Sequence, residues 1–169
     1  MRKFEAIDPK SLTLAPFRAI DEQWMLITAG TAEHCNTMTA SWGGLGTLWN
    51  LPMATCYIRP QRYTRQFVDE CEYFTLSFLP EEYRKALSLC GRESGRDMDK
   101  VKACGFTVAR AACGAPYFEQ AELVLVCRKR YVQALDGSAV PEDVKKRCYP
   151  AEDYHIMYFG EVVEVLRRQ

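Results

Sequence analysis

Short apolar blocks separated by glycine and proline dominate the pattern along the chain. Four of these blocks are rich in β-branched and aromatic residues, a composition that favours strands. They are residues 24–28, 36–42, 54–58 and 73–79. Two longer blocks, 122–134 and 155–166, are apolar on both sides for part of their length. We expect these two to be strands covered twice, by a barrel interior on one face and by a helix or a partner subunit on the other.

Three segments between the strands have helical features: 64–72, 80–91 and 97–105. Thr64 is placed to cap the first helix, and Gly91 provides a stop for the second. About six strands with three short helices predict an α+β fold that is mainly β, a six-stranded antiparallel barrel with short helical insertions. A doubly wound parallel sheet is not expected, because strands and helices do not alternate regularly and no G-x-G-x-x-G loop follows a strand.

Length and charge narrow the class of protein. A chain of 169 residues is enough for one domain, and we expect residues 1–169 to form a single unit. The 22 basic residues cancel the 22 acidic ones, so no global field attracts nucleic acid or an anionic membrane. No apolar run approaches the roughly 20 residues that span a bilayer, and no apolar signal region follows the charged start. We therefore expect a soluble, cytoplasmic protein with no nucleic-acid or membrane partner.

Eight cysteines are many for this length, but none forms a C-x-x-C pair. In a reducing cytoplasm most are expected to be small buried hydrophobic residues, with a disulfide framework or a structural zinc site as the alternatives. We expect no metal site. The chain also lacks a G-x-S-x-G elbow, an H-E-x-x-H motif and a Walker loop, which leaves hydrolase, zinc peptidase and nucleotide triphosphatase functions without support.

The first candidate for chemistry is the glycine-rich stretch 39–46 after a predicted strand. Its glycines would allow backbone N–H groups to approach a flat ligand. Trp42 and Trp49 could flank an aromatic ring. The alternative is a glycine-rich turn with a core tryptophan.

The second candidate, residues 59–64, enters the helix predicted at Thr64. Arg59 and Arg62 supply two guanidinium groups beside a hydroxyl and the exposed N–H groups of a helix start. Forked donors and the helix dipole both favour a phosphate dianion. The alternative is a solvated basic turn.

The third candidate is the polar loop 90–100, in which Arg96 or Lys100 could stabilise developing negative charge. The alternative is an ordinary connection between helices with Asp97 as the N-cap. Of the two histidines, His34 is expected to be solvated, and His155 opens the last strand and could face a cleft or the core.

Four ordered motifs together resemble the flavin reductase-like proteins and, within them, the flavoredoxin branch. The motifs are T-A-S-W-G-G, R-P-x-R-Y-T, C-G-x-x-S-G-R-D-x-D-K and D-Y-H-x-M-Y-x-G-E-V. The resemblance runs from about Trp24 to Leu166 and covers nearly the whole chain. It implies an FMN-binding split barrel, a six-stranded antiparallel barrel with helical insertions. It also implies a homodimer with flavin near the subunit interface.

The resemblance also assigns roles to residues. Thr39, Ala40, Ser41 and Trp42 would lie along the isoalloxazine ring, and the loop that covers the ring would supply three more residues. The residues expected to hold the ribityl phosphate are Arg59, Arg62, Tyr63 and Thr64, and those of the covering loop are Ser94, Gly95 and Lys100. His155 would sit where a nicotinamide could stack, and we assign catalytic roles to His155 and Lys100.

Three functions remain open at this point. The first is an FMN-binding oxidoreductase of flavin reductase type that passes electrons from NAD(P)H through flavin N5 to a flavin or a protein acceptor. The second is an FMN-bound electron-transfer protein with little NAD(P)H activity, which would receive electrons from a redox protein. The third is a non-catalytic module that binds another planar ligand, such as haem. NAD(P)H consumption separates the first from the second, and a failure to take up FMN would favour the third.

Overall fold

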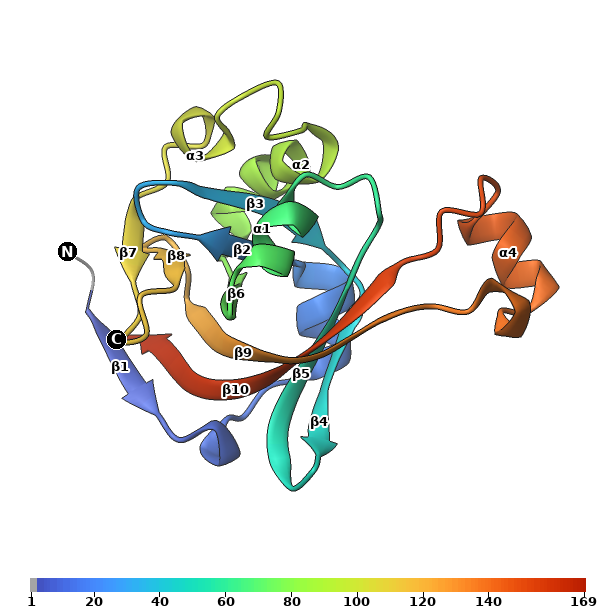
Figure 1. Cartoon of the computed structure of the whole chain (residues 1–169). Helices are drawn as coiled ribbons and strands as arrows, with labels where there is room; N and C mark the ends of the chain where they lie inside the picture. Colours follow the sequence, from blue (N-terminus) through green and yellow to red (C-terminus); the bar gives the residue numbers. More distant parts are fainter. Residues whose placement is uncertain (1–2) are drawn as a thin grey trace.

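A computed structural model describes residues 3–169, and an antiparallel sheet of eight strands that curls into an open barrel forms its centre (Figure 1). The order along the sheet is β3-β2-β6-β9-β10-β5-β4. One edge of β10 is shared, because its first half pairs with β5 and its last residues pair with β1. The strands of this sheet are β1 (Phe4–Ile7), β2 (Met25–Gly30), β3 (Cys35–Ala40), β4 (Gly43–Leu48), β5 (Leu51–Ile58), β6 (Tyr73–Phe78), β9 (Leu123–Ala134) and β10 (Ile156–Arg168).

The helices are short; two of them pack against β2 and β3, and the last one lies away from the sheet (Figure 1). A separate two-stranded sheet is formed by β7 (Val108–Arg110) and β8 (Pro116–Phe118). The α-helices are α1 (Thr64–Glu70), α2 (Arg84–Arg92), α3 (Lys100–Ala103) and α4 (Glu142–Cys148). A π-helical segment covers Arg18–Gln23, and 3-10 turns cover Pro9–Ser11, Glu81–Tyr83 and Gly137–Ala139.

Successive side chains of a strand point to opposite faces of the sheet, and this creates two apolar clusters, one on each face. In β2, Ile27 belongs to the cluster that also contains Phe67 of α1, whereas Leu26 packs with Leu87 of α2. Each fully buried side chain of this size contributes about 1.5–3 kcal/mol to stability. In β9, residues 123–127 are buried on both faces, which confirms the expectation that this strand is covered twice over that length.

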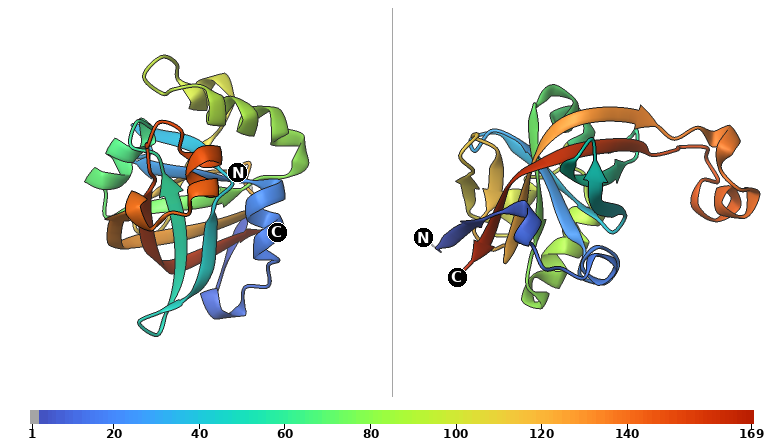
Figure 2. Two further views of the ribbon diagram at one scale, coloured as in Figure 1. Left: turned by 90° about the vertical axis from the view of Figure 1, so that its right-hand side faces the viewer. Right: turned by 90° about the horizontal axis from the view of Figure 1, so that it is seen from below.

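The outer parts of β9 and β10 leave the barrel as an arm that carries α4 (Figure 2). Beyond residue 127 the side chains of β9 become half-buried and then exposed. Tyr131 and Val132 are 42% and 41% exposed. The chain then returns through residues 148–155, which bring polar groups back to the barrel end.

The mainly β, antiparallel barrel predicted from the sequence is confirmed, with eight strands in the main sheet instead of six. One additional strand is β1, and the other is β4, which lies where a glycine-rich loop was expected. A two-residue turn joins β4 to β5, and Trp49 and Asn50 both have positive φ there. That conformation usually selects glycine or asparagine, so a tryptophan in the first position hides the hairpin from sequence patterns.

Three details of the predicted helices are wrong. Thr64 does not cap α1, because its hydroxyl is buried and accepts a hydrogen bond from Asn36 Nδ2 at 2.7 Å. The helix α2 continues through Gly91 to Arg92. Asp99, and not Asp97, is the N-cap of α3, where its carboxylate accepts the N–H of Lys102 at 3.0 Å.

Candidate functional site

The end of β3 and the end of β5 border a cavity of about 420 Å³. Residues 39–42 form one wall as β3 turns into β4, and residues 59–62 form another between β5 and α1. His155 joins them from the residue before β10. Seven residues predicted to form the site therefore line one cavity: Thr39, Ala40, Ser41, Trp42, Arg59, Arg62 and His155. Met38, Tyr57 and Gln61 complete its lining.

Arg62 is a cation without a counter-charge at this cavity. None of the ion pairs or side-chain hydrogen bonds within residues 3–169 involves its guanidinium. Burial, and next the positive charge of Arg59, lower the pKa of Arg62. A half-buried guanidinium remains charged in proteins, so it leaves a positive potential that an anion can neutralise.

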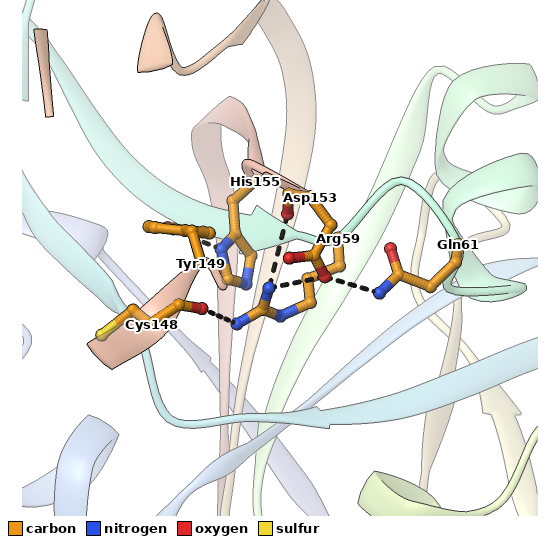
Figure 3. Close-up of polar contacts among 6 residues, drawn as sticks. All are labelled: Arg59, Gln61, Cys148, Tyr149, Asp153 and His155. Carbon is orange, nitrogen blue, oxygen red and sulfur yellow. Dashed lines mark hydrogen bonds and ion pairs between the residues drawn. The ribbon is translucent and has the colours of Figure 1, made fainter. Parts of the chain in front are cut away.

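Arg59 is held differently, by the segment that returns from the arm (Figure 3). Its Nη1 lies 2.7 Å from Asp153 Oδ2, and its Nη2 donates to the carbonyl oxygen of Cys148 at 2.8 Å. Gln61 Nε2 donates to the same Asp153 oxygen at 2.8 Å. The structure therefore shows Arg59 as the anchor that fixes residues 148–155 against the cavity, with much of its donor capacity already used.

Two residues of the cavity lining, Trp42 and His155, form an aromatic cluster with Tyr149. The ring of Trp42, which is 41% exposed, lies 4.9 Å from that of His155 and 6.5 Å from that of Tyr149. Tyr149 Oη and His155 Nδ1 are 2.8 Å apart (Figure 3). Burial raises the pKa of Tyr149, so this hydroxyl keeps its proton at neutral pH and can donate it to Nδ1.

Burial, followed by the charge of Arg59, lowers the pKa of His155 to about 4. A histidine in an unfolded chain titrates near 6.5, so between about pH 6.5 and 4 the unfolded state binds more protons than the folded state. Stability from neutral His155 is present above that window and is lost as the pH falls through it. We expect thermal melts of His155→Gln to lose less stability than the wild type between pH 7 and pH 4.

The control for this prediction is His34→Gln, which changes an exposed residue outside the cavity that contains His155. This variant should follow the wild-type pH dependence. Identical acid destabilisation of His155→Gln and the wild type would contradict the assignment of His155 as a buried neutral group.

The remaining predicted site residues lie beside this cavity and do not line it. Tyr63, Gly95 and Lys100 line a neighbouring polar cavity of about 450 Å³. Lys100 is buried, and its Nζ donates to the carbonyl oxygens of Cys90 and Glu93 at 3.3 Å each. Burial is the main cause that lowers its pKa. Lys100 thus ties the end of α2 to the start of α3.

The loop between α2 and α3 packs on the turn that contains Arg62. Arg96 Nη1 donates to the carbonyl oxygen of Gln61 at 3.2 Å, and its guanidinium lies 4.7 Å from the centre of the Tyr63 ring. Ser94 Oγ accepts the N–H of Arg96 at 3.1 Å. Gly95 lies against Asn36, where there is no room for a Cβ atom. This loop therefore supports the wall of the cavity from behind.

Thr39 is also positioned by α2. Its hydroxyl donates to the carbonyl oxygen of Leu87 at 2.5 Å, and its Cβ would be 3.4 Å from a Cβ built on Gly91. The Thr39 side chain is consequently committed to the helix. What this segment offers a ligand at the cavity is the backbone of 39–42 and the Trp42 ring.

Trp49 does not join the site. It lies at the tip of the β4–β5 hairpin, and six paired positions separate it from the cavity end of β4. At about 3.3 Å per residue this distance is on the order of 20 Å. The expectation that Trp42 and Trp49 flank one ring is therefore wrong, because the stretch between them is an extended strand.

A second, more apolar cavity of about 560 Å³ shares Ser41, Trp42 and Tyr57 with the first. Phe17, 89% exposed, and Leu135 are among its other lining residues. The site as a whole places a cationic end and an aromatic end next to each other. This arrangement suits a ligand that combines an anion with a flat ring.

Sequence reasoning missed Gln61, Tyr149 and Asp153. Asp153 and Gln61 both lay within the motifs used for the resemblance, yet a motif does not reveal that one of them pairs with Arg59. Tyr149 lies outside the quoted motifs, in the return from α4, and no local signal marked it.

Two further classes of feature are not found in the part of the chain that the structure describes. Residues 3–169 contain no group of three or more His, Cys, Asp or Glu side chains placed to hold a metal ion. No helix within those residues has the length and apolarity required to cross a membrane.

Comparison with known structures shows the same fold in several FMN-binding proteins. An FMN-binding domain of a flavin reductase-like enzyme from Shewanella baltica matches 99% of this chain and 78% of its own, with a TM-score of 0.70 and 18% identity. An FMN-binding protein from Thermus thermophilus, solved with p-hydroxybenzaldehyde, matches 100% and 83%, with a TM-score of 0.70 and 22% identity. Flavoredoxin from Methanosarcina acetivorans matches 96% and 74%, with a TM-score of 0.69 and 20% identity.

A search of the curated proteins found no match. The family comparison is decisive, because the model described as "Flavin reductase like domain" matches residues 17–169. That span contains every residue named above at these cavities. The chain belongs to the family of flavin reductase-like domains.

Proposed function

We propose that this chain binds FMN in the cavity beside Arg62 and is an FMN-dependent oxidoreductase of flavin reductase type. The observation that carries the proposal is the guanidinium of Arg62, which has no ion-pair partner among the described residues 3–169 and lies next to an aromatic wall. A phosphate dianion would supply the missing counter-charge, and a flat ring would fit against Trp42 and the shared wall of the two cavities. Membership of the flavin reductase-like family and the FMN-binding proteins of the same fold support this assignment.

The residues present fit this cofactor. Arg62 would hold the phosphate, and the backbone of 39–42 would lie along the ring, because the Thr39 hydroxyl is occupied by Leu87. Arg59, fixed by Asp153, would add positive potential behind the phosphate. When bound, FMN supplies the redox chemistry by accepting a hydride at N5.

Four more residues remain proposed members of the binding region: Tyr63 and Thr64 belong to the turn that enters α1, and Ser94 and Gly95 belong to the loop between α2 and α3. Lys100 is proposed to act as a positioning residue, because its Nζ holds the end of α2 against the start of α3 and so fixes the ends of the loop that packs beside Arg62. His155 is proposed to remain neutral at physiological pH and to close the cavity beside Trp42. A neutral imidazole leaves the cationic character of the site to the arginines.

The electron donor that we propose is NAD(P)H, with a flavin or a protein as acceptor. Purified protein is mixed with FMN, its visible spectrum is recorded, and NADH or NADPH is added without oxygen. Bleaching of the flavin bands supports reductase chemistry. Failure to take up FMN would overturn the proposed function and favour a module for another planar ligand.

The second candidate is an electron-transfer protein of the flavoredoxin type. The similarity in fold to the Methanosarcina flavoredoxin supports it, and no dinucleotide-binding G-x-G-x-x-G motif occurs in the sequence. In the same experiment, flavin bands that persist with both nicotinamides but bleach with dithionite would select this function.

We also propose a homodimer that uses the arm. Tyr131 and Val132 expose apolar surface on β9, and the Tyr131 ring packs edge-on against Phe159 of β10 at 5.8 Å. A patch of this kind on two extended strands is typical of a subunit contact. Light scattering should give twice the mass of 19.4 kDa for the wild type and a larger monomer fraction for Val132→Glu. A monomeric wild type would contradict the dimer.

A further inference from the structure

Two of the eight cysteines lie in contact beside the loop that supports the cavity wall. Cys90, near the end of α2, and Cys104, directly after α3, have their Sγ atoms 3.8 Å apart. Across residues 3–169, no other pair of cysteine sulfurs is in hydrogen-bond contact. Cys90 is buried, whereas Cys104 is half-buried and can be reached from solvent.

The surroundings of the two thiols permit a covalent bond. A disulfide needs an S–S distance of about 2.0 Å, so the sulfurs must approach each other further. Cys104 follows a helix of only four residues, which in turn follows the irregular segment 93–99. This short helix can shift at lower cost than α2, whose Leu87 and Cys90 are packed in the apolar cluster beneath it.

We propose that Cys90 and Cys104 are a redox-active dithiol that forms a reversible disulfide when a peroxide oxidises it. The Cys104 thiolate attacks one oxygen of hydrogen peroxide, the O–O bond breaks, and a sulfenic acid and a hydroxide ion result. The Cys90 thiolate then attacks the Cys104 sulfur, which forms the S–S bond and releases a second hydroxide. The thiol protons convert both hydroxides to water, so two thiols lose two electrons and one peroxide gains them.

The reaction has a defined pH dependence. Burial raises the pKa of Cys90 to about 12 and also raises that of Cys104, while the nearby positive charge of Lys100 opposes both shifts. Because the thiolate is the nucleophile, oxidation should be slow near pH 7 and faster near pH 9. The pair is therefore a slow sensor of sustained oxidation and not a rapid catalyst.

The bond would close a loop whose ends are 14 positions apart and which carries Gly95 and Arg96. Those two residues pack on Asn36, Tyr63 and the carbonyl of Gln61, next to Arg62. The oxidised form would thus hold the supporting loop in place and restrict the unfolded chain. We expect a rise in Tm of about 5–10 °C, which dithiothreitol reverses.

The test uses the full chain, treated with hydrogen peroxide at pH 9 and digested with trypsin without reduction. Cleavage after arginine and lysine places Cys90 in peptide 86–92 and Cys104 in peptide 103–110, so a linked mass of these two identifies the bond. Cys104→Ser should lose both the linked mass and the rise in Tm. Cys113→Ser, which removes an exposed cysteine, is the matched control and should keep both.

The result that would overturn the proposal is a wild-type protein in which Cys113 is oxidised while peptides 86–92 and 103–110 remain separate. Linkage of Cys90 to a different cysteine would also overturn it. Both readouts come from the wild type, so they decide the matter even where Cys104→Ser does not fold. Neither depends on FMN binding.

Discussion

Replacing Arg62 with alanine should weaken FMN binding by about 10- to 100-fold. The guanidinium is half-buried, and no carboxylate within residues 3–169 neutralises it. A charge-assisted hydrogen bond to a phosphate contributes about 1.5–3 kcal/mol, and every 1.4 kcal/mol is a tenfold change in affinity. Calorimetric titration of the FMN-free protein measures the effect.

The same substitution should leave the stability of the FMN-free protein unchanged or slightly higher. Removing Arg62 ends its repulsion with Arg59 and Lys100, which contributes to the lowered pKa of Arg62 and of Lys100. Loss of affinity without loss of Tm would separate a binding role from a structural one.

The matched control is Arg65→Ala, three positions further along the chain in the first turn of α1. Arg65 forms an exposed ion pair with Asp69 at 3.1 Å and lines neither cavity. Its loss should change FMN affinity by less than about twofold, since exposed pairs contribute little. Equal affinities of the Arg62→Ala variant and the wild type would remove Arg62 from the site.

Gly95→Ala should destabilise the protein by about 1–3 kcal/mol and lower Tm by roughly 2–10 °C. A Cβ atom at this position would collide with Asn36 Oδ1 and lie 2.8 Å from Asn36 Cγ and 3.0 Å from Tyr63 Cδ1. Asn36 cannot move freely, because its Nδ2 donates to the buried Thr64 hydroxyl at 2.7 Å. Thermal and urea unfolding measure the loss.

Gly46→Ala is the control for this substitution. Gly46 lies in the exposed hairpin strand β4, and a Cβ added there meets no atom within 4 Å. The change should be neutral or stabilise by a few tenths of a kcal/mol. A Gly95→Ala variant as stable as Gly46→Ala would show that the loop between α2 and α3 is not packed on Asn36 as described.

The sequence predicted those strands whose own residues have a composition typical of strands. β2, β3, β5, β6, β9 and β10 were expected from their apolar, β-branched and aromatic composition, and all are present. β1 was missed because its pairing depends on a distant partner, and β4 was missed because it is rich in glycine and Trp49 stands in its tight turn to β5. β1 is short and half exposed and pairs only with the end of β10, and three of the six β4 residues are glycine.

In the site, too, the sequence motifs indicated which residues come together, but they did not indicate the distant residues that pair with them. The ordered motifs placed residues 39–42, 59–62 and 155 together, and the structure brings them to one cavity. The partners of each charge could not be predicted, because Asp153 reaches Arg59 from a segment more than ninety positions away. Two cations of one motif consequently differ: Arg59 is paired with Asp153, whereas Arg62 forms no ion pair within residues 3–169.

Lys100 shows how burial changes an expectation drawn from residue type. A lysine in a polar Gly/Ser loop indicates a mobile cation that reaches a ligand. The side chain is instead buried and donates to the backbone carbonyls of Cys90 and Glu93, so it holds the end of α2. The polar residues next to Lys100 in the sequence do not indicate that its side chain is buried or which carbonyls it contacts.

The central claim is that the cavity binds FMN through its phosphate at Arg62. Calorimetric titration of the wild type and of Arg62→Ala with FMN and with riboflavin, which lacks the phosphate, tests it most directly. The account predicts that the wild type binds FMN about tenfold or more tightly than riboflavin, and that this difference falls to about twofold or less in the variant. Equal affinities of the wild type for FMN and riboflavin would contradict it.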